Sequence, residues 1–158
     1  RSSDLNPATT TIEQTVFASL HEAFDNVFSN LFDKLIEDEN LRVRIDEQFT
    51  PLIELNGYDT DLAALSGGER TAVALAYRLA LTHVINEFVS TLNTRDLLIL
   101  DEPTDGFSQH QLTRLKDIFD EIGLHQLIIV SHEAMLEGFA DHLLSVTKHE
   151  QTSTITTN

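Results

Sequence analysis

Leu97-Leu98-Ile99-Leu100-Asp101-Glu102 is an apolar run that ends in two adjacent carboxylates. A short continuous apolar run of this kind predicts a strand that is buried on both faces in a parallel sheet. Ligands of open α/β sheets bind at the carboxyl ends of the strands, which is where Asp101 and Glu102 stand. The stretch therefore predicts an α/β fold with a site at this edge. A strand-end helix cap followed by a turn is the alternative interpretation of the two acids.

A second apolar run, Leu127-Ile128-Ile129-Val130, repeats the arrangement and leads into His132. Between the two runs, apolar residues recur at helical intervals, and Ser108 and Gln111 have the spacing of a capping box. This pattern predicts a βαβ unit with a right-handed crossover. Because parallel strands end at the same edge, we expect His132 to lie near the two acids of the first run. A histidine without such neighbours is more often structural than catalytic.

The residues at this edge suit separate roles in the hydrolysis of a nucleotide. Mg²⁺ prefers carboxylate and water oxygens, so Asp101 is the candidate metal ligand. Glu102 is the candidate general base, which would orient and deprotonate an attacking water. His132 could hydrogen-bond a γ-phosphate or hold that water.

Upstream, Leu65-Ser66-Gly67-Gly68-Glu69-Arg70 opens a long apolar helix. Ser66 and Glu69 have the Ser-x-x-Glu spacing of a capping box, which marks a helix N-terminus. Gly67 and Gly68 lack a Cβ atom, so an anion can come close to the unpaired backbone N–H groups of the first turn. The motif is half of a nucleotide site. Taken alone, it could equally be an ordinary helix start with two turn glycines.

The other half of a nucleotide site is missing from the sequence. The six glycines stand at positions 57, 67, 68, 106, 123 and 138, so no Gly-x-x-x-x-Gly-Lys-Ser/Thr loop can be drawn. The chain carries no cysteine, and its 26 acidic residues against 10 Lys and Arg give a formal net charge of -16. This charge argues against the chain being the main surface that grips DNA phosphates. No apolar run has transmembrane length and there is no secretory h-region, which predicts an intracellular protein without a membrane partner.

The remaining sequence predicts a long helix and a small antiparallel sheet. Apolar residues between Ile12 and Leu35 recur at steps of three and four, which predicts an amphipathic helix of about seven turns. Alternation over residues 41–46, followed by an Asn56-Gly57 turn between two short runs, predicts a subsheet with a type I′ hairpin. We divide the chain into a polar start or cloning remnant (1–10), the helix (11–38), the head half (39–150) and a polar tail (151–158). Within the head half we expect the long helix to reach about Leu92, a short helix over 134–141 and a last strand over 142–146.

In this order the motifs resemble those of ABC-type ATPases. Residues 65–69 resemble the signature motif, residues 97–102 the Walker B strand, and His132 the switch histidine. The details over residues 100–104, 129–132 and 140–142 resemble the Rad50 family of DNA-repair ATPases. The resemblance covers about residues 10–148.

The resemblance implies the C-terminal half of a Rad50-like ABC ATPase head, with a parallel core sheet, an antiparallel subsheet and a long N-terminal helix. Such a half is incomplete without an N-terminal Walker A lobe. The implied cofactors are ATP and Mg²⁺, and the family's zinc hook lies outside this chain. Ser66, Gly67, Gly68 and Glu69 would clamp ATP held by a second head, whereas Asp101, Glu102 and His132 would act on the nucleotide of their own lobe.

The implied function is ATP-driven head dimerisation that controls an Mre11-type nuclease in double-strand break repair. The implied partners are the N-terminal Rad50 lobe, a second Rad50 head, the nuclease, and double-stranded DNA through the assembled complex. The place of action would be the cytoplasm of a prokaryote or the nucleus of a eukaryote. By this resemblance, the first helix would lie where the family's coiled coil enters the head and the nuclease docks nearby. A plain core-packing helix is an equal alternative for most of its length, and only its first half could project from the head.

Three alternatives stay open at the level of sequence. Proteins that maintain chromosome structure (SMC) share the split plan, but usually follow the acid pair with Val-Asp instead of Pro-Thr. The chain could also be a partner-binding module without its own activity, or half of a transporter ATPase, although transporters usually carry Walker A on the same chain. One departure from the family is the D-loop, where Phe107-Ser108 replaces the usual Leu-Asp pair. Asp105 could substitute for the missing acid, or Ser108 could simply cap the next helix.

Overall fold

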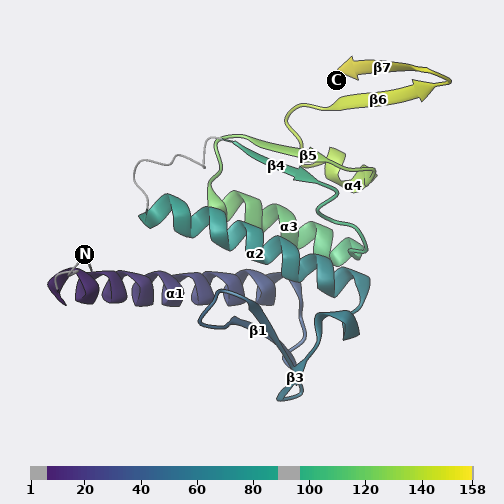
Figure 1. The fold of residues 1–158 in the computed structure, drawn as a ribbon. Helices are drawn as coiled ribbons and strands as arrows, with labels where there is room; N and C mark the ends of the chain where they lie inside the picture. The colour runs from purple at the N-terminus through teal and green to yellow at the C-terminus, as the bar shows by residue number, and fades with distance from the viewer. Residues whose placement is uncertain (1–6, 89–96, 158) are drawn as a thin grey trace.

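The computed structural model describes residues 7–88 and 97–157, with side chains from residue 12. Figure 1 shows α2 and α3 lying between α1 and the β4–β5 pair, with the β1–β3 subsheet on the far side of α1 and the β6–β7 hairpin extending away. The elements, in chain order, are α1 (Pro7–Leu35), β1 (Leu41–Ile45), β2 (Pro51–Leu55), β3 (Tyr58–Thr60), the 3₁₀ helix η1 (Leu62–Ala64), α2 (Gly67–Phe88), β4 (Leu98–Asp101), α3 (Gln109–Ile122), β5 (Leu127–Val130), α4 (Ala134–Glu137), β6 (Leu144–His149) and β7 (Thr152–Thr157).

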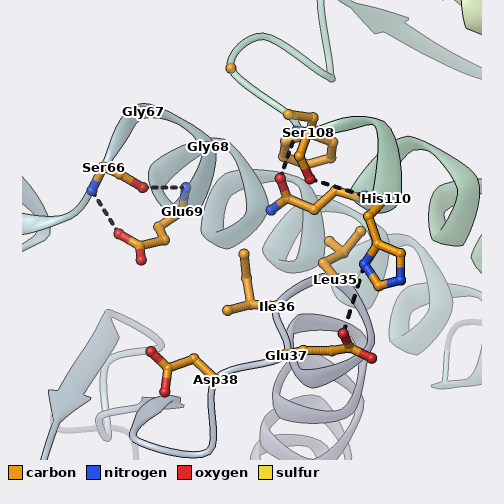
Figure 2. Close-up of a pocket in the computed structure, with 13 residues that line it drawn as sticks. Leu35, Ile36, Glu37, Asp38, Ser66, Gly67, Gly68, Glu69, Ser108 and His110 are labelled. Atoms are coloured by element: carbon orange, nitrogen blue, oxygen red, sulfur yellow. Dashed lines mark hydrogen bonds and ion pairs between the residues drawn. The ribbon is translucent and has the colours of Figure 1, made fainter.

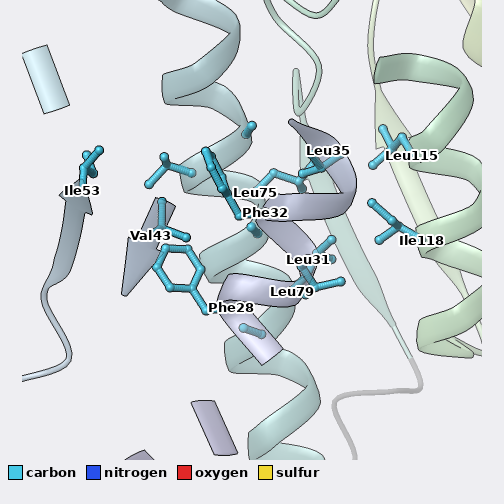
Figure 3. Packing of buried hydrophobic residues seen from close by; sticks show 14 of the residues in the cluster. Phe28, Leu31, Phe32, Leu35, Val43, Ile53, Leu75, Leu79, Leu115 and Ile118 are labelled. Carbon is cyan, nitrogen blue, oxygen red and sulfur yellow. The ribbon is translucent and has the colours of Figure 1, made fainter. Parts of the chain in front are cut away.

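The hydrophobic core lies where α1 packs on α2 and α3. Three phenylalanines of α1 are fully buried, and α2 contributes small and branched side chains that let the helices approach closely (Figure 3). The buried residues of α2 are Ala72, Val73, Leu75, Ala76, Leu79, Ala80 and Val84. The deep burial predicted for this helix is confirmed along that face. None of the described helices combines the length and apolarity needed to cross a membrane.

The antiparallel subsheet follows the predicted pattern. Its strand order is β1-β2-β3, and Leu41 pairs with Leu55 at the end of the first ladder. The turn residues Asn56 and Gly57 both have positive φ, 54° and 82°, as a type I′ turn requires. The predicted hairpin is therefore confirmed.

Helix α1 covers the outer edge of this subsheet with polar side chains. Ser29 Oγ donates to the carbonyl of Val43 at 2.8 Å, and Asp25 Oδ1 accepts from the N–H of Ile45 at 2.8 Å. One turn earlier, His21 Nε2 donates to the carbonyl of Asp46 at 2.8 Å. These side chains satisfy backbone groups of β1 and of Asp46, the residue that follows it, which a neighbouring strand would otherwise pair.

The predicted βαβ unit is confirmed. β4 and β5 are parallel neighbours, with Asp101 opposite Val130 at the carboxyl end. Ser108 and Gln111 form the predicted capping box at the start of α3, and Gly123 ends the helix in the left-handed conformation at φ 64°.

The prediction that these strands are buried on both faces is wrong for this chain. Leu98, Leu100, Leu127 and Ile129 face the helices, whereas Ile99 is 53% exposed and Val130 is 52% exposed. The reason is that the described helices cover only one face of a two-stranded parallel sheet. The other face presents branched apolar side chains to solvent.

The ends of several elements also differ from the predictions. α1 already begins at Pro7, because proline is well tolerated in the first turn of a helix. The predicted polar tail contains β7, whose threonines pair with β6 along its whole length. β6 runs over residues 144–149, later than predicted, and α4 is shorter because it ends before Gly138. The predicted end of the long helix near Leu92 lies outside the described residues.

Candidate nucleotide site

The signature turn has the geometry that its sequence predicts. The backbone N–H of Ser66 donates to Glu69 Oε2 at 2.7 Å, and the N–H of Glu69 donates to Ser66 Oγ at 3.3 Å (Figure 2). This reciprocal pair is a capping box at the N-terminus of a 22-residue helix. The partial positive charge of that terminus faces solvent beside Gly67, which is exposed.

The two glycines of the motif have different environments. A Cβ atom on Gly67 would meet nothing within 4 Å, whereas a Cβ atom on Gly68 would lie 2.6 Å from the carbonyl oxygen of Gly106. Gly67 thus leaves open space for a ligand, and Gly68 allows a close approach between two stretches of backbone. The sequence interpretation gave both glycines the same role and missed this difference.

A cavity of about 640 Å³ lies in front of the signature turn. Figure 2 shows three segments converging on it: the end of α1, the signature turn, and the start of α3. Its lining includes the carboxylates of Glu37, Asp38 and Glu69, together with His110. His110 Nδ1 lies 3.7 Å from Glu37 Oε2, so the imidazole faces one of these acids. Sequence reasoning missed Glu37 and His110, because they come from segments that meet only through the tertiary fold.

The second cluster stands at the ends of β4 and β5. His132 Nδ1 lies 3.1 Å from Glu102 Oε2, in hydrogen-bonding distance. The side chains of His132 and Glu102 are 72% and 44% exposed. The prediction that parallel strands bring His132 to the acid pair is confirmed for Glu102. Asp101 occupies the last position of β4 beside them and is exposed.

Glu102 has an unusual backbone conformation. Its φ is 43°, in the left-handed region that non-glycine residues rarely adopt. Its N–H donates to the carbonyl of Val130 at 2.8 Å, which ties it to the end of β5. Residues held in this region are concentrated at functional sites, where the surrounding structure enforces the strain.

Three carboxylates surround His132. The hydrogen bond to Glu102 is the largest influence and raises the pKa of His132 above its ordinary value. The negative charges of Glu102, Glu133 and Asp105 act in the same direction. His132 Nε2 also lies 3.9 Å from Glu133 Oε1, so both ring nitrogens face acids. These acids therefore favour the imidazolium form of His132 more than water does for a free histidine.

The donor set at Asp101 fits a magnesium site that is shared with a substrate. Among residues 7–88 and 97–157, no group of three His, Asp or Glu side chains is placed to hold a metal ion. Mg²⁺ usually takes one or two protein carboxylates and completes its shell with water and phosphate oxygens. An exposed carboxylate at a strand end suits that arrangement, whereas a cage made of protein ligands alone does not exist in the described part.

The altered D-loop residue Ser108 has a structural role. Its N–H donates to Gln111 Oε1 at 2.8 Å, and its Oγ accepts from the N–H of Gln111 at 3.3 Å. The hydroxyl is thus used in capping α3. Of the two possibilities that the sequence left open, the structure supports the capping role for Ser108.

The structure keeps the signature turn and the strand-end cluster as separate sites. Among the described residues, no hydrogen bond or ion pair joins Ser66, Gly67, Gly68 or Glu69 to Asp101, Glu102 or His132. The loop that follows Glu102 connects them along the chain.

Comparison with known proteins identifies the relatives of this chain. No protein-family model matches it. The Rad50 ATPase of DNA double-strand break repair from Thermococcus kodakarensis is 35% identical over 132 residues, which are 80% of this chain and 14% of that protein. The Pyrococcus abyssi Rad50 ATPase is 35% identical over 79% of the chain and again 14% of the relative. The chain thus spans about a seventh of the length of these curated relatives.

Solved structures show the same fold. The SMC head domain from Pyrococcus furiosus, which carries an extended coiled coil and is bound to the C-terminal domain of ScpA, has a TM-score of 0.71 at 19% identity, covering 94% of this chain and 37% of the other. The SMC likeness is one of fold, whereas the likeness to Rad50 extends to the sequence. The chain therefore matches a segment of Rad50 ATPases in sequence and the head domains of SMC proteins in fold.

Proposed function

We propose that this chain is the C-terminal half of an ATPase head that hydrolyses ATP only with an N-terminal Walker A lobe and as a dimer of heads. The observation that carries the proposal is the pair of Glu102 and His132, 3.1 Å apart at the ends of two parallel strands. A second observation is the free space in front of Gly67, at the N-terminus of α2, where a phosphate could approach the backbone. The two sites would thus serve two different nucleotides, one in each head.

The N-terminal lobe would cover the exposed face of the β4–β5 pair. Leu97, Ile99, Ile128 and Val130 are all exposed there, although branched apolar residues in a parallel sheet are normally buried on both sides. The β6–β7 hairpin presents further apolar side chains, Leu144, Val146 and Ile155. A lobe that extends this sheet would bury both sets and bring the Walker A loop to the strand ends.

At the strand ends, each residue would have one task. Asp101 would hold Mg²⁺, which supplies positive charge to the phosphate oxygens. Glu102 would accept the proton of the attacking water, which it can reach because its side chain is exposed. His132 would donate a hydrogen bond from its imidazolium to the γ-phosphate or to that water.

At the signature turn, Ser66, Gly67 and Gly68 would contact the γ-phosphate of ATP held by the second head. The N-terminal charge of α2 and the serine hydroxyl provide the donors, and Glu69 holds the turn in its capped conformation. Loss of the γ-phosphate after hydrolysis would remove the group that joins the heads. The heads could then separate, which would release bound partners.

The outer half of α1 would carry the contact with an Mre11-type nuclease. Ile12, Val16 and Phe17 are exposed apolar residues on this half. Double-stranded DNA would be bound through the assembled complex, because a net charge of -16 does not favour a DNA surface on this segment. These partners fit a role in double-strand break repair inside the cell.

The central experiment combines this chain with its N-terminal lobe and measures ATP-driven dimerisation and phosphate release. Ser66→Arg should abolish dimerisation, because the added cation and bulk occupy the phosphate position. Glu102→Gln should dimerise on ATP but hydrolyse it at least tenfold more slowly. Thr113→Arg, which adds the same charge on the exposed face of α3, should behave as wild type.

Two results would contradict this function: dimerisation of Ser66→Arg on ATP, or hydrolysis by Glu102→Gln at the wild-type rate. The exposed apolar residues of α1 favour one alternative, a partner-binding module without activity. In that case Val16→Asp would abolish nuclease binding while ATP and Glu102→Gln would have no effect on the complex.

A further inference from the structure

The loop from Glu102 to Gly106 runs between two fixed points. At its start, the N–H of Glu102 is bonded to the carbonyl of Val130 at the end of β5. At its end, Gly106 has φ 78° and packs against the backbone of Gly67 and Gly68 at the start of α2. One short segment thus connects the strand-end cluster to the signature turn.

The contact at the signature turn is made by backbone alone. A Cβ atom on Gly106 would lie 3.1 Å from the nitrogen of Gly68, and a Cβ atom on Gly68 would lie 2.6 Å from the carbonyl oxygen of Gly106. The first distance is too short for a Cβ atom unless the backbone of α2 or of the loop shifts by a few tenths of an ångström, and the second excludes a Cβ atom without a larger shift. Because no flexible side chain intervenes, a displacement of one backbone must displace the other.

The residues between the two fixed points make the loop stiff. Pro103 restricts its own φ and is buried, and Thr104 is 1% exposed. Glu102 holds a left-handed conformation at φ 43°, which persists only where the neighbouring structure enforces it. The two fixed points and the buried middle of the loop provide that constraint.

We propose that Gly106 is a positioning residue for Glu102: its backbone contact with Gly68 holds the loop so that the Glu102 carboxylate faces His132. This inference rests on the proposed function in taking Glu102 as the base. It adds that the signature turn and the base of one head are joined through backbone packing within a single chain.

The first test needs no nucleotide. In NMR spectra of the chain, Gly106→Ala should shift the Glu102 amide and the His132 ring signals, because the new Cβ pushes the loop from α2. Gly123→Ala is the matched control: Gly123 also has positive φ, 64°, but a Cβ there would meet nothing within 4 Å. It should leave both signals in place.

A second variant separates the close approach from the backbone conformation. Asparagine adopts positive φ more readily than alanine, so Gly106→Asn keeps the conformation but still adds a Cβ. It should shift the same two signals, and it carries the test if Gly106→Ala does not fold. The proposal is overturned if Gly106→Asn has the spectrum of the wild type, or if Gly123→Ala shifts the signals as strongly.

The second test measures hydrolysis with the N-terminal lobe. Gly106→Asn should lower kcat by roughly tenfold to a hundredfold, since a misplaced catalytic group has effects of this order, and leave KM for ATP within about twofold. An unchanged kcat with a raised KM would overturn the positioning role. If the wild-type mixture shows no ATPase activity, the proposed function fails, while the NMR comparison still decides whether Gly106 positions Glu102.

Discussion

The phenol of Tyr77 on α2 donates a hydrogen bond to the main-chain carbonyl of Phe49 at 2.8 Å. Phe49 lies in the loop between β1 and β2 and has φ 63°, a strained value for an aromatic residue. Its ring makes edge-to-face contacts with Phe17 and Phe24 of α1, with centroids 5.5 and 5.7 Å apart. The loop is therefore fastened to two helices at once, by its ring on α1 and by its carbonyl on α2.

Replacing Tyr77 by phenylalanine should lower the free energy of unfolding by about 1 kcal/mol, because the half-buried carbonyl of Phe49 loses its partner. Urea denaturation monitored by circular dichroism measures the change. Tyr58→Phe is the control, since Tyr58 is 77% exposed. Equal stability of the two variants would show that the hydrogen bond contributes nothing.

Thr104 should tolerate valine better than serine. Its side chain is buried, and among the described residues none offers a hydrogen-bond partner to Oγ1. Valine removes the unpaired hydroxyl and keeps the shape, so stability should stay unchanged or rise by up to about 1 kcal/mol. Serine keeps the hydroxyl and loses a methyl group, at a cost of about 1 kcal/mol. A thermal melt in which valine is the less stable variant would indicate that the hydroxyl is bonded.

Arg114 on α3 should stabilise the end of α1 mainly through one backbone contact. Its guanidinium donates to the carbonyl of Lys34 at 3.0 Å and also forms an ion pair with Glu37. The Glu37 side chain is 59% exposed, so its pair with Arg114 should contribute less than about 1 kcal/mol. Arg114→Met should thus lower the free energy of unfolding more than Glu37→Gln does, because the loss of the guanidinium also leaves the carbonyl of Lys34 at the end of α1 unpaired.

A double-mutant cycle on Arg114 and Glu37 tests this division. The coupling energy from urea unfolding of the two single variants and the double variant should be small. A coupling energy as large as the whole loss of stability in Arg114→Met would contradict the prediction, since the ion pair would then account for all the stabilisation that Arg114 provides.

His132 should titrate at a higher pH in the wild type than in Glu102→Gln. The Glu102 hydrogen bond raises the pKa of His132, so removing that carboxylate should return it toward the ordinary value. The raised pKa of His132 also makes stability depend on pH. The contribution of the pair is fully present below the unfolded pKa of about 6.5 and is lost as pH rises through the higher folded pKa.

An NMR titration of the His132 ring signals measures both values. Asp105→Asn should lower the His132 pKa by a smaller step, because Asp105 acts only through its charge. A larger effect from Asp105 than from Glu102 would reverse the order of influences described above.

The elements that sequence predicted well depend on short-range patterns. The capping box of Ser66 and Glu69 needs only three residues of spacing, and the Asn56-Gly57 turn needs only two residues that accept positive φ. The meeting of Glu102 with His132 followed from strand direction, since parallel neighbours place equivalent ends together. These features do not depend on tertiary packing, so the sequence is enough to predict them.

Features that depend on distant partners could not be predicted. Gly68 needs its lack of a side chain because of Gly106, which lies 38 positions later in the chain. The exposure of Ile99 depends on which elements cover the sheet. An apolar strand sequence by itself predicts burial on both faces. The acid Glu37 joins the signature cavity only because α1 ends beside α3.

The polar side chains of α1 along β1 also affect how the chain behaves when many copies are present. Unpaired strand edges are templates for edge-to-edge aggregation. At the β1 edge, the carbonyl of Val43 and the N–H of Ile45 are already bonded to Ser29 and Asp25, so an incoming strand would have to break those bonds first. Substituting the two α1 residues by alanine would free this edge for cross-β growth without changing the hydrophobic core.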